Sequence, residues 1–183
     1  AGSNVDEIRQ MRRAELNIVV HAELGEPLAQ LLQEQYGMPY CSLLPPYGVE
    51  GTAEWLRMIA ERLWLGEGVR QTIEQQRKAA ETILRQGTVD AERMWGALWY
   101  ERAVIAAPIS VAVGLGAALR RELADFGSLT VMAYGGNQLL LTALPLEVDT
   151  LLSADAPQGE ELLRRLHRED LLLSSGAEYA VAG

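Results

Sequence analysis

The stretch from residue 16 to residue 65 constrains the fold of this chain more than any other. It begins with a short apolar run at residues 16–20, continues with leucines at helical spacing up to Tyr36-Gly37, and returns to an extended stretch at residues 39–43. Short, bounded runs of β-branched residues are typical of buried strands, and a helix between two of them predicts a parallel crossover. The order therefore predicts a βαβ unit, whose ligands bind at the carboxyl ends of the strands.

The second half of the chain repeats this order after a long polar helix. Strands are expected at residues 103–107, 129–133, 150–153 and 171–174, and helices at residues 108–126 and 157–168. The helix between the halves covers residues 69–85, and we expect Gly87 to break it. In the first half, Pro27 is expected at or near the first position of its helix and Thr52 at the cap of the next.

These patterns predict an α/β fold: Rossmann-like, three layers (α/β/α), with parallel strands. We expect two half-lobes joined by a helical connector. Their expected bounds are residues 1–68 for the first half-lobe, 69–100 for the connector and 101–183 for the second half-lobe, whose C-terminus we expect to be truncated.

Charge and cysteine content exclude several classes of function. The net charge is -9 and the isoelectric point about 4.8, which argues against binding to nucleic acid or to an anionic membrane surface. The single cysteine, Cys41, excludes a disulfide framework and a self-contained zinc or iron–sulfur site, and a buried role is expected for it. No signal peptide and no apolar run of about 18 residues is visible, so we expect a cytoplasmic protein.

His21 and Glu23 are the candidate functional residues, because they directly follow the first predicted strand. A histidine at this edge can be a ligand or can form an acid–base pair with Glu23. The alternative is a histidine whose ring is satisfied by a loop carbonyl, and the residues leave both interpretations open. The other histidine, His167, is expected on a solvated surface.

Other glycine and serine motifs carry less information. Gly114 and Gly116 resemble part of a dinucleotide fingerprint, but they fall inside a predicted helix, so close helix packing is the better interpretation. Gly135-Gly136 and Ser174-Ser175-Gly176 follow strands, where they could cradle an anion or simply form turns. The chain has no phosphate-binding loop, Ser–His–Asp set or paired metal motif.

Several segments, in order, resemble the nitrogenase component 1-type oxidoreductases. This family includes molybdenum–iron protein subunits, their cofactor scaffolds, and the light-independent protochlorophyllide and chlorophyllide reductases. The segments that carry the resemblance are Ala14-Glu15-Leu16-Asn17-Ile18-Val19, Glu34-Gln35-Tyr36-Gly37-Met38-Pro39-Tyr40, Tyr47-Gly48-Val49-Glu50-Gly51-Thr52, Trp55-Leu56-Arg57-Met58-Ile59-Ala60, Arg102-Ala103-Val104-Ile105-Ala106 and Glu169-Asp170-Leu171-Leu172. The resemblance implies a fragment of the middle and later Rossmann-like domains of such a protein.

Three departures from the family bear on the cofactor. In the alpha chain of the molybdenum–iron protein, the matching strand ends in a cysteine that ligates the cofactor, and His21 takes that position here. The family's basic loop after a later strand is replaced by Ala106-Ala107-Pro108-Ile109-Ser110, and the N-terminal cluster-binding cysteines are absent from this sequence. The resemblance therefore implies a scaffold-like, tetrapyrrole-reductase-like or uncharacterised member.

The resemblance implies a domain of an oxidoreductase subunit that houses a metal cofactor or a tetrapyrrole. Such a subunit receives electrons from an ATP-dependent iron–sulfur reductase partner and assembles with a homologous subunit. His21 is the implied cofactor-binding residue and metal ligand. For this chain alone we expect neither a resident cofactor nor activity. The alternative is a non-catalytic, flavodoxin-like module that binds a small ligand or a protein; a nucleotide- or flavin-binding enzyme is disfavoured by the missing phosphate loops.

Overall fold

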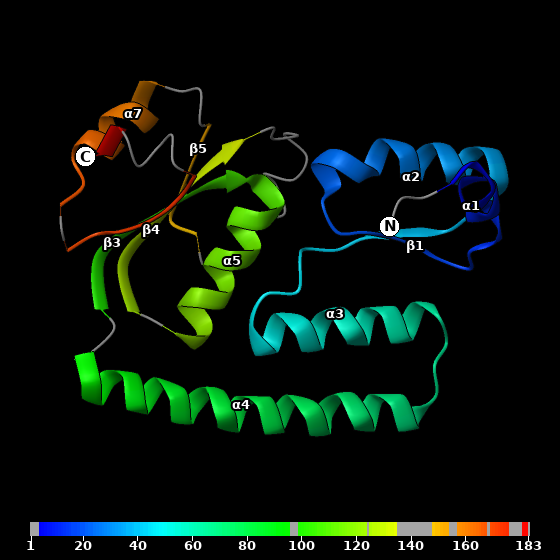
Figure 1. Cartoon of the computed structure of the whole chain (residues 1–183), viewed down its shortest axis with the longest axis horizontal. Coiled ribbons are helices and arrows are strands. Elements are labelled where there is room, and N and C mark those ends of the chain that lie inside the picture. The colour runs from blue at the N-terminus through cyan, green and yellow to red at the C-terminus, as the bar shows by residue number, and fades with distance from the viewer. Residues whose placement is uncertain are drawn as a thin grey trace.

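The computed structural model describes residues 4–95, 99–123, 125–134, 148–153, 157–167, 169–175 and 181–182. In this part of the chain the strands form two separate sheets, both parallel (Figure 1). The strands are β1 (Asn17–Val19), β2 (Tyr40–Ser42), β3 (Trp99–Pro108), β4 (Asp125–Tyr134), β5 (Thr150–Ser153) and β6 (Leu171–Leu173). The helices are α1 (Val5–Gln10), a 3-10 turn (Met11–Arg13), α2 (Ala22–Tyr36), α3 (Gly48–Arg62), α4 (Glu67–Trp95), α5 (Ile109–Glu122) and α7 (Pro157–Arg164). None of the helices in these ranges is both long and apolar enough to cross a membrane.

The first sheet pairs β1 with β2, and α2 connects them. Gly37 ends α2 in the left-handed conformation, as its position after Tyr36 predicts. The expected start of α2 at Pro27 is wrong, because the helix begins at Ala22 and contains the proline. The reason is local: the backbone carbonyl of His21 accepts the Gly25 N–H over 2.9 Å, so the first turn closes before the proline is reached.

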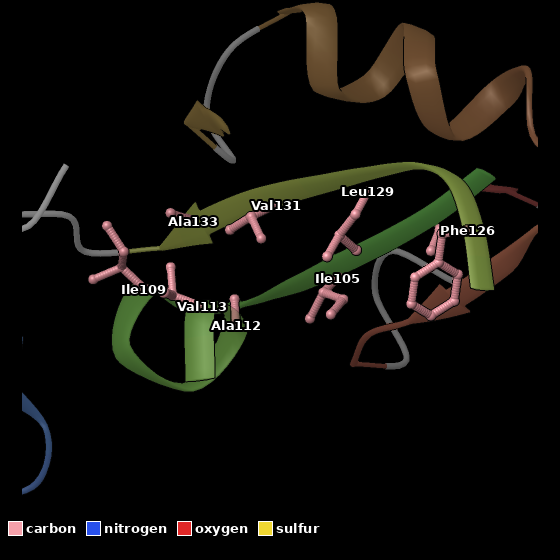
Figure 2. Close-up of a cluster of buried hydrophobic side chains, with 9 residues drawn as sticks. Ile105, Ile109, Ala112, Val113, Phe126, Leu129, Val131 and Ala133 are labelled. Atoms are coloured by element: carbon pink, nitrogen blue, oxygen red, sulfur yellow. The ribbon is translucent and has the colours of Figure 1, made fainter. Parts of the chain in front are cut away.

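The second sheet has the strand order β5-β4-β3-β6 and a helical layer on each face. Helix α5 covers one face and α7 the other, which gives this half the predicted three layers (Figure 1). Figure 2 shows the side chains of α5 turned toward those of β3 and β4. This core cluster consists of Ala103, Ile105, Ile109, Ala112, Val113, Phe126, Leu129, Val131 and Ala133. The α/β prediction with parallel strands is confirmed.

The predicted helix over residues 108–126 extends four residues too far at its C-terminal end. Helix α5 ends at Glu122, and Phe126 belongs to β4, where its ring stacks on Tyr100 with centroids 6.1 Å apart. Gly127 therefore does not end a helix. It lies within β4, where a Cβ would come within 2.6 Å of the Glu101 backbone oxygen, so only glycine fits between the neighbouring strands.

Two helices lie between the sheets in the chain and pack on each other. Ala53 and Ala60 of α3 are buried against Ile73 of α4. Helix α4 runs unbroken through Gly87, contrary to expectation, because one glycine costs a helix only about 1 kcal/mol. Helix α3 begins at Gly48 rather than at the expected Thr52. The division of the chain at residues 68 and 100 stays a prediction.

Candidate functional site

The carboxyl ends of β1 and β3 lead into two helices whose first turns meet. His21 follows β1 and caps α2, whereas Ser110 lies in the first turn of α5, directly after β3. In Figure 1 these two helix starts lie where the two halves of the molecule adjoin. The region past the carboxyl ends of parallel strands is where α/β folds bind ligands, so this junction is the candidate site.

Ser110 bridges the two candidate residues that the sequence singled out. Its Oγ lies 2.9 Å from His21 Nδ1, and its hydroxyl donates to Glu23 Oε1 over 2.8 Å. Ser110 is only 2% exposed, while His21 and Glu23 are partly buried. A buried hydroxyl without a partner would cost about 1–3 kcal/mol, and here both partners come from the other sheet's helix.

Glu23 brings a carboxylate into the first turn of α2. The unpaired backbone N–H groups of a helix N-terminus favour a negative charge there. Only one of its oxygens is used: Oε2 is shielded from solvent and has no hydrogen-bond partner among the residues that the structure describes. A shielded carboxylate oxygen without a hydrogen-bond partner is unusual in folded proteins. Packing alone does not explain it, which supports a functional role for this site.

The other ring nitrogen of His21 has no such bond. No described residue hydrogen-bonds to Nε2. This nitrogen is also not shielded from solvent, unlike Glu23 Oε2. An imidazole held at Nδ1 with Nε2 open can coordinate a metal ion or exchange a proton with a bound molecule. His167, by contrast, is exposed, as the sequence predicts.

The sequence identified two of these three residues. His21 and Glu23 were placed correctly at the end of the first strand, but they meet through Ser110 rather than directly. Ser110 belongs to the segment that the resemblance places at the family's basic loop, yet the sequence analysis gave it no role of its own. A signal was present, because Ser110 is the single polar residue in the apolar run from Ile109 to Leu119.

The other sequence motifs have packing roles or lie outside the described residues. A Cβ at Gly114 would lie 3.0 Å from Tyr47 Cδ2, and one at Gly116 would lie 3.1 Å from Leu129 Cδ2. Close helix packing therefore explains both glycines, as predicted. Gly135, Gly136 and Gly176 fall outside the described residues, so the anion-binding interpretation of those loops stays a prediction.

A separate cavity opens one helical turn further along α5. Its volume is about 280 Å³, and His21 is not among the residues that line it. The small residues Gly114, Ala117 and Ala118 face Trp55 of α3 across this space. The loop after β2 lines this cavity too, through Leu44, Pro45 and Tyr47.

Cys41 is buried in β2, as expected for a lone cysteine. Burial raises the pKa of its thiol, with a smaller opposing effect of Arg62. Among the described residues, no group of three or more His, Cys, Asp or Glu side chains is arranged to hold a metal ion.

Comparisons with known proteins identify the family. The family model described as nitrogenase component 1 type oxidoreductase matches residues 1–182. One of the subunits of the light-independent protochlorophyllide reductase from Synechococcus sp. (strain JA-2-3B'a(2-13)) is 39% identical over 62 residues, which cover 34% of this chain and 12% of that protein. Its counterpart from Staurastrum punctulatum is 29% identical over 131 residues, which cover 67% of this chain and 25% of that protein.

A solved structure described as nitrogenase Cp1 at pH 6.5 has the same fold. It matches 100% of this chain and 39% of its own length, with a TM-score of 0.69 and 16% sequence identity. The chain thus spans between about a tenth and two fifths of the proteins that it matches. The family match over residues 1–182, in agreement with the fold, makes this chain a member of the nitrogenase component 1-type oxidoreductase family.

Proposed function

We propose that this chain forms part of an oxidoreductase subunit and supplies one wall of its cofactor or pigment site. The observation that carries the proposal is the junction of His21, Ser110 and Glu23 at the carboxyl ends of two parallel strands. In the full assembly, electrons would come from an ATP-dependent iron–sulfur reductase partner, with a homologous subunit completing the site. The relatives named as light-independent protochlorophyllide reductases favour a tetrapyrrole as the group that is bound.

His21 fits such a group as a single point of attachment. Its Nε2 is free of hydrogen bonds to described residues, and its ring is fixed from the other side by a buried serine. A redox-active metal or tetrapyrrole, when bound, would supply the electron-transfer chemistry. The chain's own residues would orient the ring so that Nε2 faces the bound group, with Glu23 held behind the ring through Ser110.

The test compares the two histidines of the chain in the protein in which it occurs naturally. We expect His21→Ala to lose the absorbance change on adding protochlorophyllide, or the bound iron, whereas the matched variant His167→Ala keeps both. His21→Cys should retain iron better than His21→Ala, because thiolate also ligates iron. Equal binding by His21→Ala and the unmodified protein would refute the ligand role.

The rival is a non-catalytic module that docks a ligand or a protein. Under our proposal the 183-residue chain stays colourless after reconstitution with iron and sulfide, since its described residues contain no complete metal site. The natural protein should transfer electrons when supplied with a reductase component and ATP. A natural protein that binds neither iron nor tetrapyrrole would support the module instead.

A further inference from the structure

The hydrogen bond from Ser110 to Glu23 determines whether His21 Nδ1 donates or accepts a hydrogen bond. A serine hydroxyl has one hydrogen to donate, while an ionised carboxylate can only accept. The Ser110 hydroxyl therefore donates to Glu23 Oε1, 2.8 Å away. Because that hydrogen is used, the bond of 2.9 Å between Ser110 Oγ and His21 Nδ1 must be donated by the imidazole.

We propose that Ser110 and Glu23 are positioning residues that hold His21 as the Nδ1–H tautomer. The neutral ring then carries its lone pair on Nε2, which is the nitrogen without a partner among the described residues. Histidines that bind metals commonly donate their other ring N–H to a carboxylate or carbonyl, which fixes the tautomer and the ring orientation. Here a serine stands between the imidazole and the carboxylate. The ligand that Nε2 would take is a metal ion, whether free, in a cluster or held in a tetrapyrrole, and this part rests on the proposed function.

The burial of Ser110 argues against a merely local role for its hydroxyl. The side chain is 2% exposed and lies in the first turn of α5, where a serine hydroxyl can bond to nearby backbone groups. The bonds of its hydroxyl instead reach His21 and Glu23, which lie 89 and 87 residues away in the sequence. A serine that spans two halves of the chain in this way acts on the histidine rather than on its own helix.

The same three residues could instead prepare His21 to deliver a proton. The two arrangements differ in which ring nitrogen of His21 carries the hydrogen. A neutral imidazole with hydrogen on Nε2 must accept a hydrogen bond at Nδ1, which requires the Ser110 hydroxyl to turn toward the ring and away from Glu23. The tautomer of His21 therefore separates a histidine prepared to bind a metal ion from one prepared to deliver a proton.

Nitrogen NMR of the full 183-residue chain tests the proposal directly, since His21 and His167 are its only histidines. In a sample labelled with ¹⁵N-histidine, a nitrogen that carries hydrogen resonates far from one that carries a lone pair. We expect His21 to show hydrogen on Nδ1 and a lone pair on Nε2. His167→Gln assigns the signals, and exposed His167 serves as the internal reference.

Two variants show whether Ser110 causes the tautomer. Ser110→Ala removes the acceptor, and Glu23→Ala frees the hydroxyl to turn toward the ring; both should move hydrogen from Nδ1 to Nε2 of His21 and leave His167 unchanged. Ser110→Thr keeps a hydroxyl and should keep the Nδ1–H form. The proposal is overturned if unmodified His21 carries hydrogen on Nε2, or if folded Ser110→Ala and Glu23→Ala both keep the original tautomer.

A titration with Ni²⁺ separates this inference from the proposed function. We expect the paramagnetic ion to broaden the His21 signals at lower concentration than those of His167. Ser110→Ala should weaken that binding about 10–100-fold, the usual effect of losing a residue that orients a ligand. A correct tautomer without preferred Ni²⁺ binding would leave the positioning roles standing and remove support for the ligand role. A wrong tautomer would overturn the positioning roles alone.

Discussion

Replacing Gly48 by alanine should destabilise this chain more than replacing Gly37, although both have left-handed backbones. Their φ angles are +71° and +67°. A Cβ at Gly37 would meet nothing within 4 Å, whereas one at Gly48 would lie 2.5 Å from Glu122 Oε1. The Glu122 side chain is flexible and can move away, but its carboxylate accepts the Val49 and Glu50 backbone N–H groups at 2.7 and 2.9 Å. Moving it uncaps the N-terminus of α3.

The magnitude follows from these two contributions. A left-handed backbone costs a residue other than glycine about 1–2 kcal/mol, and this is the whole effect expected for Gly37→Ala. Losing an N-terminal cap adds about 0.5–2 kcal/mol. Gly48→Ala should therefore cost about 1.5–4 kcal/mol in total. In a Glu122→Ala background the cap is already lost, so Gly48→Ala should fall back to the cost of Gly37→Ala.

Urea unfolding followed by circular dichroism measures the free energy of each variant. Thermal unfolding gives a second reading, at about 2–4 °C per kcal/mol for a chain of this size. The informative quantity is the coupling energy, which is the difference between the cost of Gly48→Ala in the unmodified chain and its cost in the Glu122→Ala background. Gly37→Ala is the matched control for the left-handed backbone. Equal costs for the two glycines, or the same Gly48→Ala cost with and without Glu122, would refute the reasoning.

Three further outcomes follow from the structure. Because burial raises the pKa of its thiol, Cys41 should react with Ellman's reagent only as the chain unfolds, and immediate reaction in native buffer would contradict this. Trp55 Nε1 is shielded from solvent and has no acceptor among the described residues. Trp55→Phe should therefore change the free energy of unfolding by no more than about 1 kcal/mol. A loss above about 3 kcal/mol in urea unfolding would contradict the absence of an acceptor. Hydrogen bonds from Arg77, and then from Arg57, lower the pKa of Glu74 from 4.5 to about 2, so the stabilisation it gives is present above pH 4.5 and lost as the pH falls toward 2. The gap in unfolding midpoint between the unmodified chain and Glu74→Gln should close over that range, and a constant gap would contradict the pairing.

The strands were predictable because each is a bounded apolar run between polar segments. The expected strand at residues 150–153 coincides with β5, Thr150–Ser153. The starts of helices were harder, because their caps are not where local patterns point. Pro27 and Thr52 look like N-terminal signals, but α2 is closed by the carbonyl of His21 and α3 is capped by Glu122, which lies more than 70 residues away. A cap supplied by a distant helix has no signature in the neighbouring sequence.

In the candidate site, too, residues with a local sequence signal were predictable, and a residue defined by a contact with a distant segment was not. His21 and Glu23 were identifiable because a polar pair directly follows an apolar strand. Ser110 was not, because its role exists only when the first turns of two helices meet. Phe126 illustrates the limit in another way: it continues the apolar spacing of α5, yet it fits equally well into the alternation of β4, where the structure has it.

The two glycines of α5 link helix packing to the site. Gly114 lets the helix approach Tyr47 and Pro45 on one side, while Gly116 lets it approach the second sheet on another. A methyl group at either place would leave only about 3.0–3.1 Å to the nearest side-chain carbon, so the helix or its neighbour would have to move by tenths of an ångström. Ser110 lies about one turn before Gly114, and its bonds of 2.8 and 2.9 Å already sit within the narrow range in which such bonds are strong. A sequence pattern that resembles part of a nucleotide-binding loop therefore serves close helix packing, on the same helix whose first turn carries the serine that contacts His21.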